Sequence, residues 1–312
     1  MGFAHRTFAV LCLTVILAAL VACSSTSSQS ASPNVSKALR DDSITVGSFD
    51  FAESHVLAEI YSKALEGGGY HVRRAFDLGP REFVAPALSR GLIEFVPEYA
   101  GTALHFSSLG LRSATSNVRA THDSLVRTLE KSHVTALAPA PAQDANTFVV
   151  TRATAAHDGL RTLSDVANVA HDLTFGGPPE CPSRPQCLAG LEQVYGLKFK
   201  EFVRLDAGGP VTRQALKDGY VDVALLFTTD PSIKRDGLVE LIDDRDLQPA
   251  ENVIPLVRTE VVDHFGPGLV ALVNAVSTRI TTAVLSDLNA QVESGKSDAA
   301  VAATWLNEES LR

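Results

Sequence analysis

Apolar residues first gather at the amino terminus, in a run that is too short to cross a membrane. Residues 7–22 read TFAVLCLTVILAALVA, and Arg6 is the only Lys, Arg, Asp or Glu that precedes them. A membrane-spanning helix needs about 20 apolar residues, whereas a basic residue followed by a shorter apolar stretch is typical of a secretory signal peptide. We therefore predict a signal peptide at residues 1–22.

The apolar run ends in LVAC at residues 20–23, and a serine-rich tract follows it. This ending resembles a bacterial lipobox, which implies that Cys23 becomes the lipidated first residue and anchors the chain in the membrane. A plain signal peptide or a single anchor helix with an incidental Cys is the alternative. The tract shows no apolar periodicity, so we predict a lipidated Cys and flexible tether at 23–42.

Patterns typical of strands and helices alternate after the tether. Residues 44–47 (ITVG) predict a short strand that ends in Gly, and residues 54–65 carry apolar side chains at helical spacing. The glycines at 67–69 end this helix, and residues 70–74 predict the next strand. Alternating strands and helices indicate a mostly parallel sheet with helices packed against it.

The same pattern returns 128 residues later. Residues 87–99 (ALSRGLIEFVPEY) align without a gap with residues 215–227 (ALKDGYVDVALLF). Each copy reads as a helix end, a Gly stop, an acidic residue and a buried strand that closes on an aromatic residue. Because each unit predicts right-handed crossovers between parallel strands, the repeat predicts two similar α/β lobes.

Each copy ends at Tyr99 or Phe227, where a strand is predicted to end. Ligands of open parallel sheets bind beyond the carboxyl ends of the strands, so two facing lobes would bring both rings into one cleft. The alternative is that both rings close the core of their own lobe. We assign residues 43–147 and 256–312 to lobe 1 and residues 148–255 to lobe 2.

Charge and missing motifs narrow the functions that this body can have. The formal net charge is −9, and it becomes −10 when the predicted signal peptide and Arg6 are removed. An acidic body without basic clusters argues against a nucleic-acid partner. Hydrolase, zinc-protease and phosphate-loop motifs are missing, and the nine His have no metal-ligand spacing. We therefore expect no catalytic site, no metal and no cofactor.

Four Cys are present, and two of them belong to the mature body. Cys12 falls in the predicted signal peptide and Cys23 is the proposed lipid site, which leaves Cys181 and Cys187. Outside the cytoplasm, an even pair this close in sequence predicts a disulfide. A zinc site would need a second pair of ligands, which the sequence does not contain.

Motifs spread in order over residues 43–310 resemble those of glycine betaine/choline-type solute-binding proteins of ABC importers. The motifs are ITVGSFDFAES (44–54), DLG (77–79), PAL (86–88), PEYAGT (97–102), FTTD (227–230) and Trp305-Leu306. The resemblance implies an α/β, two-lobed periplasmic-binding-protein-like fold of type II. It also implies an extracytoplasmic monomer that delivers a compatible solute, such as glycine betaine or choline, to an ABC permease.

In that family the two lobes close on a quaternary ammonium group held among Tyr rings, and an Arg takes any carboxylate of the solute. Carried over by motif, the resemblance implies the ligand-binding residues Tyr99, Thr102, Asn146, Phe148, Arg184, Phe227 and Glu251. Arg184 lies between the two Cys, so a disulfide would hold its loop. An ordinary surface Arg is the alternative for this position.

The chain departs from the family pattern at several of these positions. Phe148 and Phe227 stand where the family often has Tyr, and Glu251 stands where a Tyr usually precedes an Asn. Glu251 could pair with a cation and favour choline over a zwitterion, or face solvent. The departures leave open another ligand, such as a flat aromatic or polyol compound. A sensor of the same fold and an exported enzyme are the alternative functions.

Overall fold

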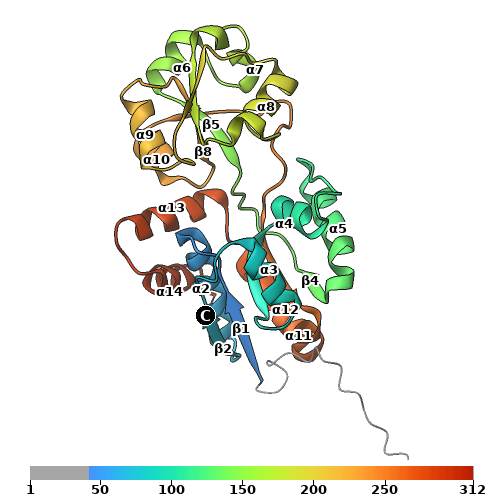
Figure 1. The fold of residues 1–312 in the computed structure, drawn as a ribbon. Helices are drawn as coiled ribbons and strands as arrows, with labels where there is room; N and C mark the ends of the chain where they lie inside the picture. The colour runs from blue at the N-terminus through green and yellow to red at the C-terminus, as the bar shows by residue number, and fades with distance from the viewer. Residues whose placement is uncertain (1–41, 312) are drawn as a thin grey trace, which may run out of the picture. The chain divides into compact units, whose positions relative to one another are not determined.

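Two mixed sheets organise the chain in the computed structural model, which describes residues 42–311. The predicted signal peptide and Cys23 lie outside the described residues, as does the tether except for its last residue, Asp42. We call each sheet with the helices packed on it a lobe. Figure 1 shows both sheets and the helices around them.

The first sheet has the strand order β2-β1-β3-β10-β4. Its strands are β1 (Ser43–Gly47), β2 (His71–Ala75), β3 (Phe95–Tyr99), β4 (Val134–Ala136) and β10 (Val253–Arg258). Strand β1 runs parallel to β2 and β3, whereas β10 runs antiparallel to β3 and β4. All five residues of β3 are buried, as expected for a strand covered on both faces.

The second sheet repeats this arrangement with the order β7-β6-β8-β5-β9. Its strands are β5 (Asn146–Val150), β6 (Thr174–Gly177), β7 (Glu201–Arg204), β8 (Val223–Phe227) and β9 (Val239–Leu241). Strand β6 runs parallel to β7 and β8, and β5 runs antiparallel to β8 and β9. Each strand therefore has a counterpart in the first sheet, and β5 is the counterpart of β10.

The internal repeat found in the sequence matches the structure element by element. Helix α3 (Arg81–Ser89) leads into β3, and helix α9 (Pro210–Lys217) leads into β8. The two strands start and end 128 residues apart, which is the offset of the aligned segments. The predicted fold class, two α/β lobes with mixed sheets flanked by helices, is confirmed.

The chain passes between the sheets twice, through residues 137–145 and 242–252. Strand β10 belongs entirely to the first sheet, because Val253 already pairs with Tyr99 at its start. Strand β5 belongs entirely to the second sheet, because Asn146 pairs with Phe227. The expected lobe boundaries at 147/148 and 255/256 thus fall inside β5 and β10. The first residue of each strand already pairs within the sheet to which the strand belongs.

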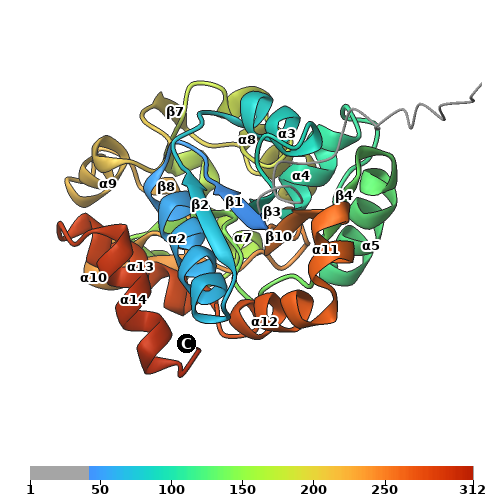
Figure 2. The same ribbon diagram turned by 90° about the horizontal axis from the view of Figure 1, so that it is seen from below.

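Helices cover both faces of the first sheet. They are α2 (Ala52–Gly67), α3, α4 (Ala100–Ser107), α5 (Val118–Leu129), η1 (Glu130–Ser132), α11 (Thr259–Phe265), α12 (Pro267–Ser277), α13 (Thr282–Glu293) and α14 (Asp298–Glu308). Helices α12 and α14 both contact α2 (Figure 2), whose Val56 and Ile60 are fully buried between them and the sheet. Helices α3, α4 and α5 contribute to a separate core on the other face.

In the part of the chain that the structure describes, no single helix has the length and apolar character of a membrane span. The pair α12 and α13 meets those criteria of length and composition only when taken together, and an 80° bend separates the two helices.

Shorter helices cover the second sheet. They are α6 (Arg152–Asp158), α7 (Leu163–Val166), η2 (Ala170–Asp172), η3 (Cys181–Ser183), α8 (Leu188–Gly190), η4 (Leu191–Tyr195), α9 and α10 (Pro231–Arg235). The predicted disulfide between Cys181 and Cys187 is confirmed, with the two Cα atoms 5.2 Å apart. It closes the loop that starts with η3 and carries Arg184.

Candidate functional site

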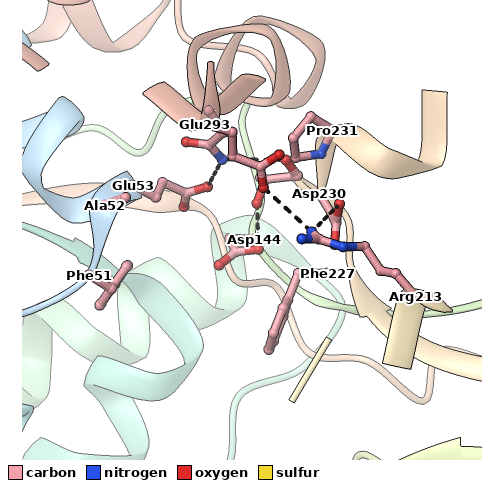
Figure 3. Close-up of a pocket in the computed structure, with 11 residues that line it drawn as sticks. Phe51, Ala52, Glu53, Asp144, Arg213, Phe227, Asp230, Pro231 and Glu293 are labelled. Carbon is pink, nitrogen blue, oxygen red and sulfur yellow. Dashed lines mark hydrogen bonds and ion pairs between the residues drawn. The ribbon is translucent and has the colours of Figure 1, made fainter. Parts of the chain in front are cut away.

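A cavity of about 660 Å³ lies between the carboxyl ends of β3 and β8 and is lined by residues of both lobes. Tyr99 and Phe227, the last residues of these two strands, both line it. A second cavity of about 420 Å³ adjoins the first, and Phe51, Asp144 and Phe227 line both. Figure 3 shows this shared boundary, where Phe51 and Phe227 come from opposite sides with Asp144 between them.

The larger cavity brings together six of the seven residues that the sequence pointed to. These are Tyr99, Thr102, Asn146, Arg184, Phe227 and Glu251. The two strand-end aromatic residues thus share one cavity, although the backbone pairs them with different strands.

Phe148 lies apart from this group, in the core of lobe 2. Its side chain is 1% exposed, and its ring meets the Phe175 ring edge-on with the centroids 5.7 Å apart. Phe148 lies two residues deeper in β5 than Asn146 and opposite Leu225 of β8. Asn146 reaches the cavity because it is the first residue of β5, at the end of the strand. Phe148 lies further along the strand, where the helices of lobe 2 cover the sheet.

Phe51 supplies an aromatic wall that the sequence analysis did not assign. It directly precedes α2 and is 40% exposed. Its ring stacks against the Tyr99 ring, with centroids 6.2 Å apart and an interplanar angle of 27°, and against the Phe49 ring at 5.8 Å. The cavity is therefore faced by Phe51 and Tyr99 from lobe 1 and by Phe227 from lobe 2.

Glu53, in the first turn of α2, is a buried carboxyl group beside these rings. The Tyr99 hydroxyl donates a hydrogen bond to Oε1 of Glu53 at 2.6 Å, and Nδ2 of Asn289 donates to Oε2 at 2.6 Å. Burial raises the pKa of Glu53 above its ordinary value, and these hydrogen bonds only partly offset that effect. Burial also raises the pKa of Tyr99 well above 10, so its hydroxyl remains a donor.

Asp144 lies in the segment that leaves the first sheet and is the second buried carboxyl group. Its Oδ1 accepts a hydrogen bond of 2.9 Å from the Thr229 hydroxyl. Burial, followed by the charge of Glu53, raises the pKa of Asp144 well above its ordinary value. Glu53 and Asp144 therefore release their protons less readily than exposed carboxyl groups do. A cation enclosed beside them would favour their ionised forms.

Glu251, which lines the larger cavity, provides a third carboxyl group. It accepts hydrogen bonds from the Thr102 backbone N–H at 3.0 Å and from the Thr102 hydroxyl at 2.8 Å. Burial raises its pKa as well. Gly101 makes this approach possible, because a Cβ atom there would lie 2.7 Å from Oε1 of Glu251.

The basic groups near the cavity are mostly neutralised by their own partners. Arg81 makes two hydrogen bonds of 2.6 and 2.9 Å with Glu98, and Arg213 lies 3.2 Å from Asp230. Arg184 lines the cavity from the disulfide loop, and its guanidinium has no hydrogen bond or ion pair with any described residue. Of the carboxyl groups that line the two cavities, Asp230 and Glu293 are paired with Arg213, whereas Glu53, Asp144 and Glu251 have no basic partner among the described residues. Arg184 is the one guanidinium there without such a partner.

This composition suits an organic cation better than a metal ion. Among residues 42–311, no three His, Cys, Asp or Glu side chains are placed to hold a metal. Aromatic faces attract a cation through the ring quadrupole, and nearby carboxylates add a direct charge interaction. The arrangement can therefore enclose a small cationic group between the lobes.

Comparison with known proteins agrees with this geometry. The family described as the substrate binding domain of ABC-type glycine betaine transport systems matches residues 42–308. The chain belongs to this family.

Curated relatives align over most of their length. A glycine-betaine-binding protein of Pseudomonas aeruginosa is 29% identical over 287 residues, which cover 86% of this chain and 89% of the relative. The glycine betaine-binding protein YehZ of Escherichia coli is 26% identical over 276 residues, covering 85% and 90%. The description of the family places its members in solute transport.

Solved structures share the fold. The crystal structure of a glycine betaine/carnitine/choline ABC transporter protein superposes with a TM-score of 0.79 at 22% identity, covering 86% of this chain and 99% of that one. Ligand-free YehZ from Escherichia coli superposes with a TM-score of 0.73 at 25% identity over 86% and 99% of the two chains. The expected type II architecture is thus the fold of the family.

Several residues that line the two cavities were not assigned by the sequence analysis, among them Phe51, Glu53 and Asp144. Phe51 and Glu53 stand inside the opening motif, which was matched as a motif without a role for either side chain. Asp144 precedes the Asn146 motif by two residues. Nothing local in the sequence shows that Asp144 and Glu53, 91 positions apart, approach each other, because their contact depends on how the two sheets are joined.

Proposed function

We propose that this chain captures a small quaternary-ammonium solute between its lobes and delivers it to an ABC importer. The observation that carries the proposal is one cavity system faced by three aromatic rings and by three carboxyl groups without basic partners. The cationic head would lie among Phe51, Tyr99 and Phe227. Each ring would contribute about 0.5–2 kcal/mol, more when water is excluded.

The balance of charge favours a solute with net positive charge. Glu53, Asp144 and Glu251 outnumber Arg184, so a choline-like cation gains more than a zwitterion does. A zwitterion such as glycine betaine would need Arg184 to bind its carboxylate across the cavity. We therefore propose that choline binds more tightly than glycine betaine.

Lobe closure would couple capture to delivery. Proteins with two lobes around a ligand site close by movement about the connecting segments, here residues 137–145 and 242–252. Closure would bring Phe227 of lobe 2 toward Phe51 and Tyr99 of lobe 1 and exclude water from the cation.

We further propose that the mature chain begins with lipidated Cys23 and works as a monomer on the extracytoplasmic face of the membrane. The support is the LVAC ending of the apolar run and the serine-rich tract after it. Labelled palmitate fed to producing cells should enter the wild-type chain. Incorporation into a Cys23→Ala variant at the wild-type level would reject the anchor.

Isothermal titration of residues 24–312 tests the solute class. Glycine betaine, choline, carnitine, ectoine and ergothioneine would be titrated separately into protein freed of ligand by unfolding and refolding. We expect heat of binding with choline and weaker binding of the zwitterions. The absence of heat with every one of the five compounds would reject the proposal.

A larger ring-bearing betaine is the second candidate. The two adjoining cavities, which share Phe51 and Phe227, offer room beyond a trimethylammonium head for a flat ring. One relative, the ergothioneine transport permease/ergothioneine binding protein EgtU of Helicobacter pylori, is 23% identical over 258 residues, which are 45% of its length. Ergothioneine binding tighter than choline would favour this candidate.

A further inference from the structure

Arg81, the first residue of α3, connects the wall of the larger cavity to a buried carboxylate. Its Nε donates to Oε1 of Glu98 at 2.6 Å and its Nη2 donates to Oε2 at 2.9 Å, while Glu98 itself is buried. The guanidinium also lies over the Phe49 ring, with Cζ 5.1 Å from the ring centroid. Because a bidentate pair fixes the plane of a guanidinium, one face of Phe49 is covered by a group that is held in place.

Phe49 belongs to a row of three stacked rings that reaches the cavity. The Phe49 and Phe51 rings have an interplanar angle of 8°, and the Phe51 and Tyr99 rings have one of 27°. Phe49 and Tyr99 are buried, whereas Phe51, which stacks with both, is 40% exposed. Phe51 is therefore the ring of this row with the most surface available to a solute, and the two buried rings support it.

Glu98 joins the two ends of this row. Its Oε2, which accepts from Arg81, also accepts a hydrogen bond of 2.8 Å from the backbone N–H of Tyr99. Arg81, Phe49, Phe51, Tyr99 and Glu98 thus form a closed circuit of contacts. A displacement of the ion pair would reach Phe51 by two routes, through Phe49 and through Tyr99.

Ring packing is what orients the Phe51 side chain. Hydrogen bonds fix the backbone around it, because the Phe49 N–H donates to Oγ of Ser54 at 2.9 Å and the His55 N–H donates to the Phe51 carbonyl at 3.2 Å. Neither bond sets the rotamer of a phenyl ring, which has no hydrogen-bonding group of its own. Since aromatic pairs have preferred stacking geometries, the orientation of Phe51 depends on Phe49 and Tyr99.

Direct contact with the solute is the alternative role for Arg81. The side chain lines the larger cavity, where a free guanidinium could bind a carboxylate. Its Nε and Nη2 donate instead to Glu98, which balances its charge within the wall. Stacking on Phe49 is therefore the route by which Arg81 acts on the surface that a solute would touch.

We propose that Arg81 is a positioning residue for a cationic solute: paired with Glu98 and stacked on Phe49, it holds the Phe51 ring in the orientation that lines the cavity. The inference rests on the proposed capture of a quaternary-ammonium solute and adds a residue that acts without touching it. A cation gains from an aromatic ring only when it lies over the face of that ring. Displacing Phe51 should therefore cost a cation more affinity than it costs an uncharged compound of the same shape.

Titration of choline and of its uncharged isostere 3,3-dimethylbutan-1-ol tests the positioning role. Arg81→Gln should weaken choline binding about fivefold and leave binding of the isostere within about twofold. Arg90→Gln, which replaces an exposed Arg at the other end of α3, is the control and should change neither affinity. Equal losses for both compounds, or a loss confined to glycine betaine, would overturn the proposal. The second result would make Arg81 a contact of the solute carboxylate.

A double-variant cycle tests whether Arg81 acts through Phe51. In a Phe51→Leu background, Arg81→Gln should change choline affinity by less than about twofold, because coupled residues do not act additively. Phe49→Leu removes the supporting ring without leaving Glu98 as an unpaired buried charge, so it repeats the cycle should Arg81→Gln fold poorly. A loss of about fivefold that persists without the Phe51 ring, for both substitutions, would contradict the proposed route.

Fluorine NMR measures the Phe51 ring in the absence of any solute. With para-fluorophenylalanine at position 51, the wild type should give one narrow resonance, and Arg81→Gln and Phe49→Leu should each shift or broaden it. An unchanged resonance in both variants would overturn the positioning role. Choline titration of the wild type tests capture separately, so a failure of capture can be told apart from a failure of positioning.

Discussion

Tyr99 combines two contributions in one side chain. Its ring faces the cavity beside Phe51, and its hydroxyl donates to Glu53. The ring offers a π face to a cation, whereas the hydroxyl stabilises the ionised form of Glu53. These contributions can be separated, because Phe keeps the ring and loses only the hydroxyl.

Tyr99→Ala should weaken choline binding by about 1–2 kcal/mol, because the ring face is lost. Tyr99→Phe should weaken it less at pH 8, where Glu53 ionises more readily. Isothermal titration of both variants measures the difference, and thermal unfolding reports whether each one folds. A Tyr99→Phe variant as impaired as Tyr99→Ala would contradict a role for the ring.

The buried carboxyl groups predict how stability changes with pH. The pKa values of Glu53 and Asp144 are raised in the folded chain, so the folded state binds more protons than the unfolded state above about pH 4. The free energy of unfolding of ligand-free protein should therefore fall as pH rises from about 4 through the raised pKa values. Each pKa unit of difference corresponds to about 1.4 kcal/mol.

Asp144→Asn should flatten this pH dependence, and chemical denaturation at a series of pH values measures it. Glu53 and Glu251, whose pKa values burial also raises, should keep part of the pH dependence in this variant. Choline affinity of the wild type should change in the opposite direction and rise with pH, because the cation favours the ionised carboxyl groups. Affinity that is independent of pH, with an unchanged slope in Asp144→Asn, would argue against this assignment.

At the scale of elements, the loop closed by the disulfide positions Arg184 at the cavity. This side chain is the one guanidinium there that has no partner among the described residues. Cys181 and Cys187 are buried in the core of lobe 2, whereas Arg184 between them is exposed. The bond restricts the loop, so Arg184 remains near the cavity at a lower entropic cost. A solute with a carboxylate would depend on this restriction, and one without a carboxylate would not.

Replacing both Cys by Ala should therefore weaken glycine betaine binding about three- to tenfold and leave choline binding within about twofold. Arg184→Gln, which keeps the disulfide, should show the same selectivity. Titration of both solutes into each variant makes the comparison. Equal losses for the two solutes would indicate that the loop acts on the whole lobe rather than through Arg184.

Strand ends and the repeat could be predicted from the sequence, whereas several side-chain placements could not. Local apolar patterning identifies β3 and β8, and a constant offset relates them, so the shared position of Tyr99 and Phe227 was foreseeable. The burial of Phe148 could not be foreseen. It depends on the helices that cover β5 only two residues after its first residue, Asn146. Distant partners such as Glu53 with Tyr99 are set by the tertiary fold alone.

At the scale of the molecule, ion pairs connect the two lobes beside the smaller cavity. Glu293 of α13 in lobe 1 lies 3.4 Å from Arg213 and 3.2 Å from Arg235, both in lobe 2. Lys234 and Asp287 form another such pair at 3.0 Å. Exposed pairs of this kind contribute little to folding, about 0–1 kcal/mol each. That amount is enough to shift an equilibrium between lobe arrangements several-fold.

Glu293→Gln should leave the free energy of unfolding within about 0.5 kcal/mol of the wild type and shift the ligand-free lobes toward a more open arrangement. Small-angle X-ray scattering would detect the shift as a larger radius of gyration. Glu192→Gln, an exposed substitution within lobe 2, is the control. Scattering that is identical for the wild type and Glu293→Gln would show that this network does not influence the lobes.

The positive charge of the solute, held by rings and carboxyl groups from both lobes, is the central claim. Choline and 3,3-dimethylbutan-1-ol have nearly the same shape, but a carbon atom replaces the ammonium nitrogen in the second compound. Titrating both into ligand-free protein at pH 8 isolates the contribution of charge. The account predicts that choline binds at least about tenfold more tightly. Equal affinity for the two compounds would contradict it.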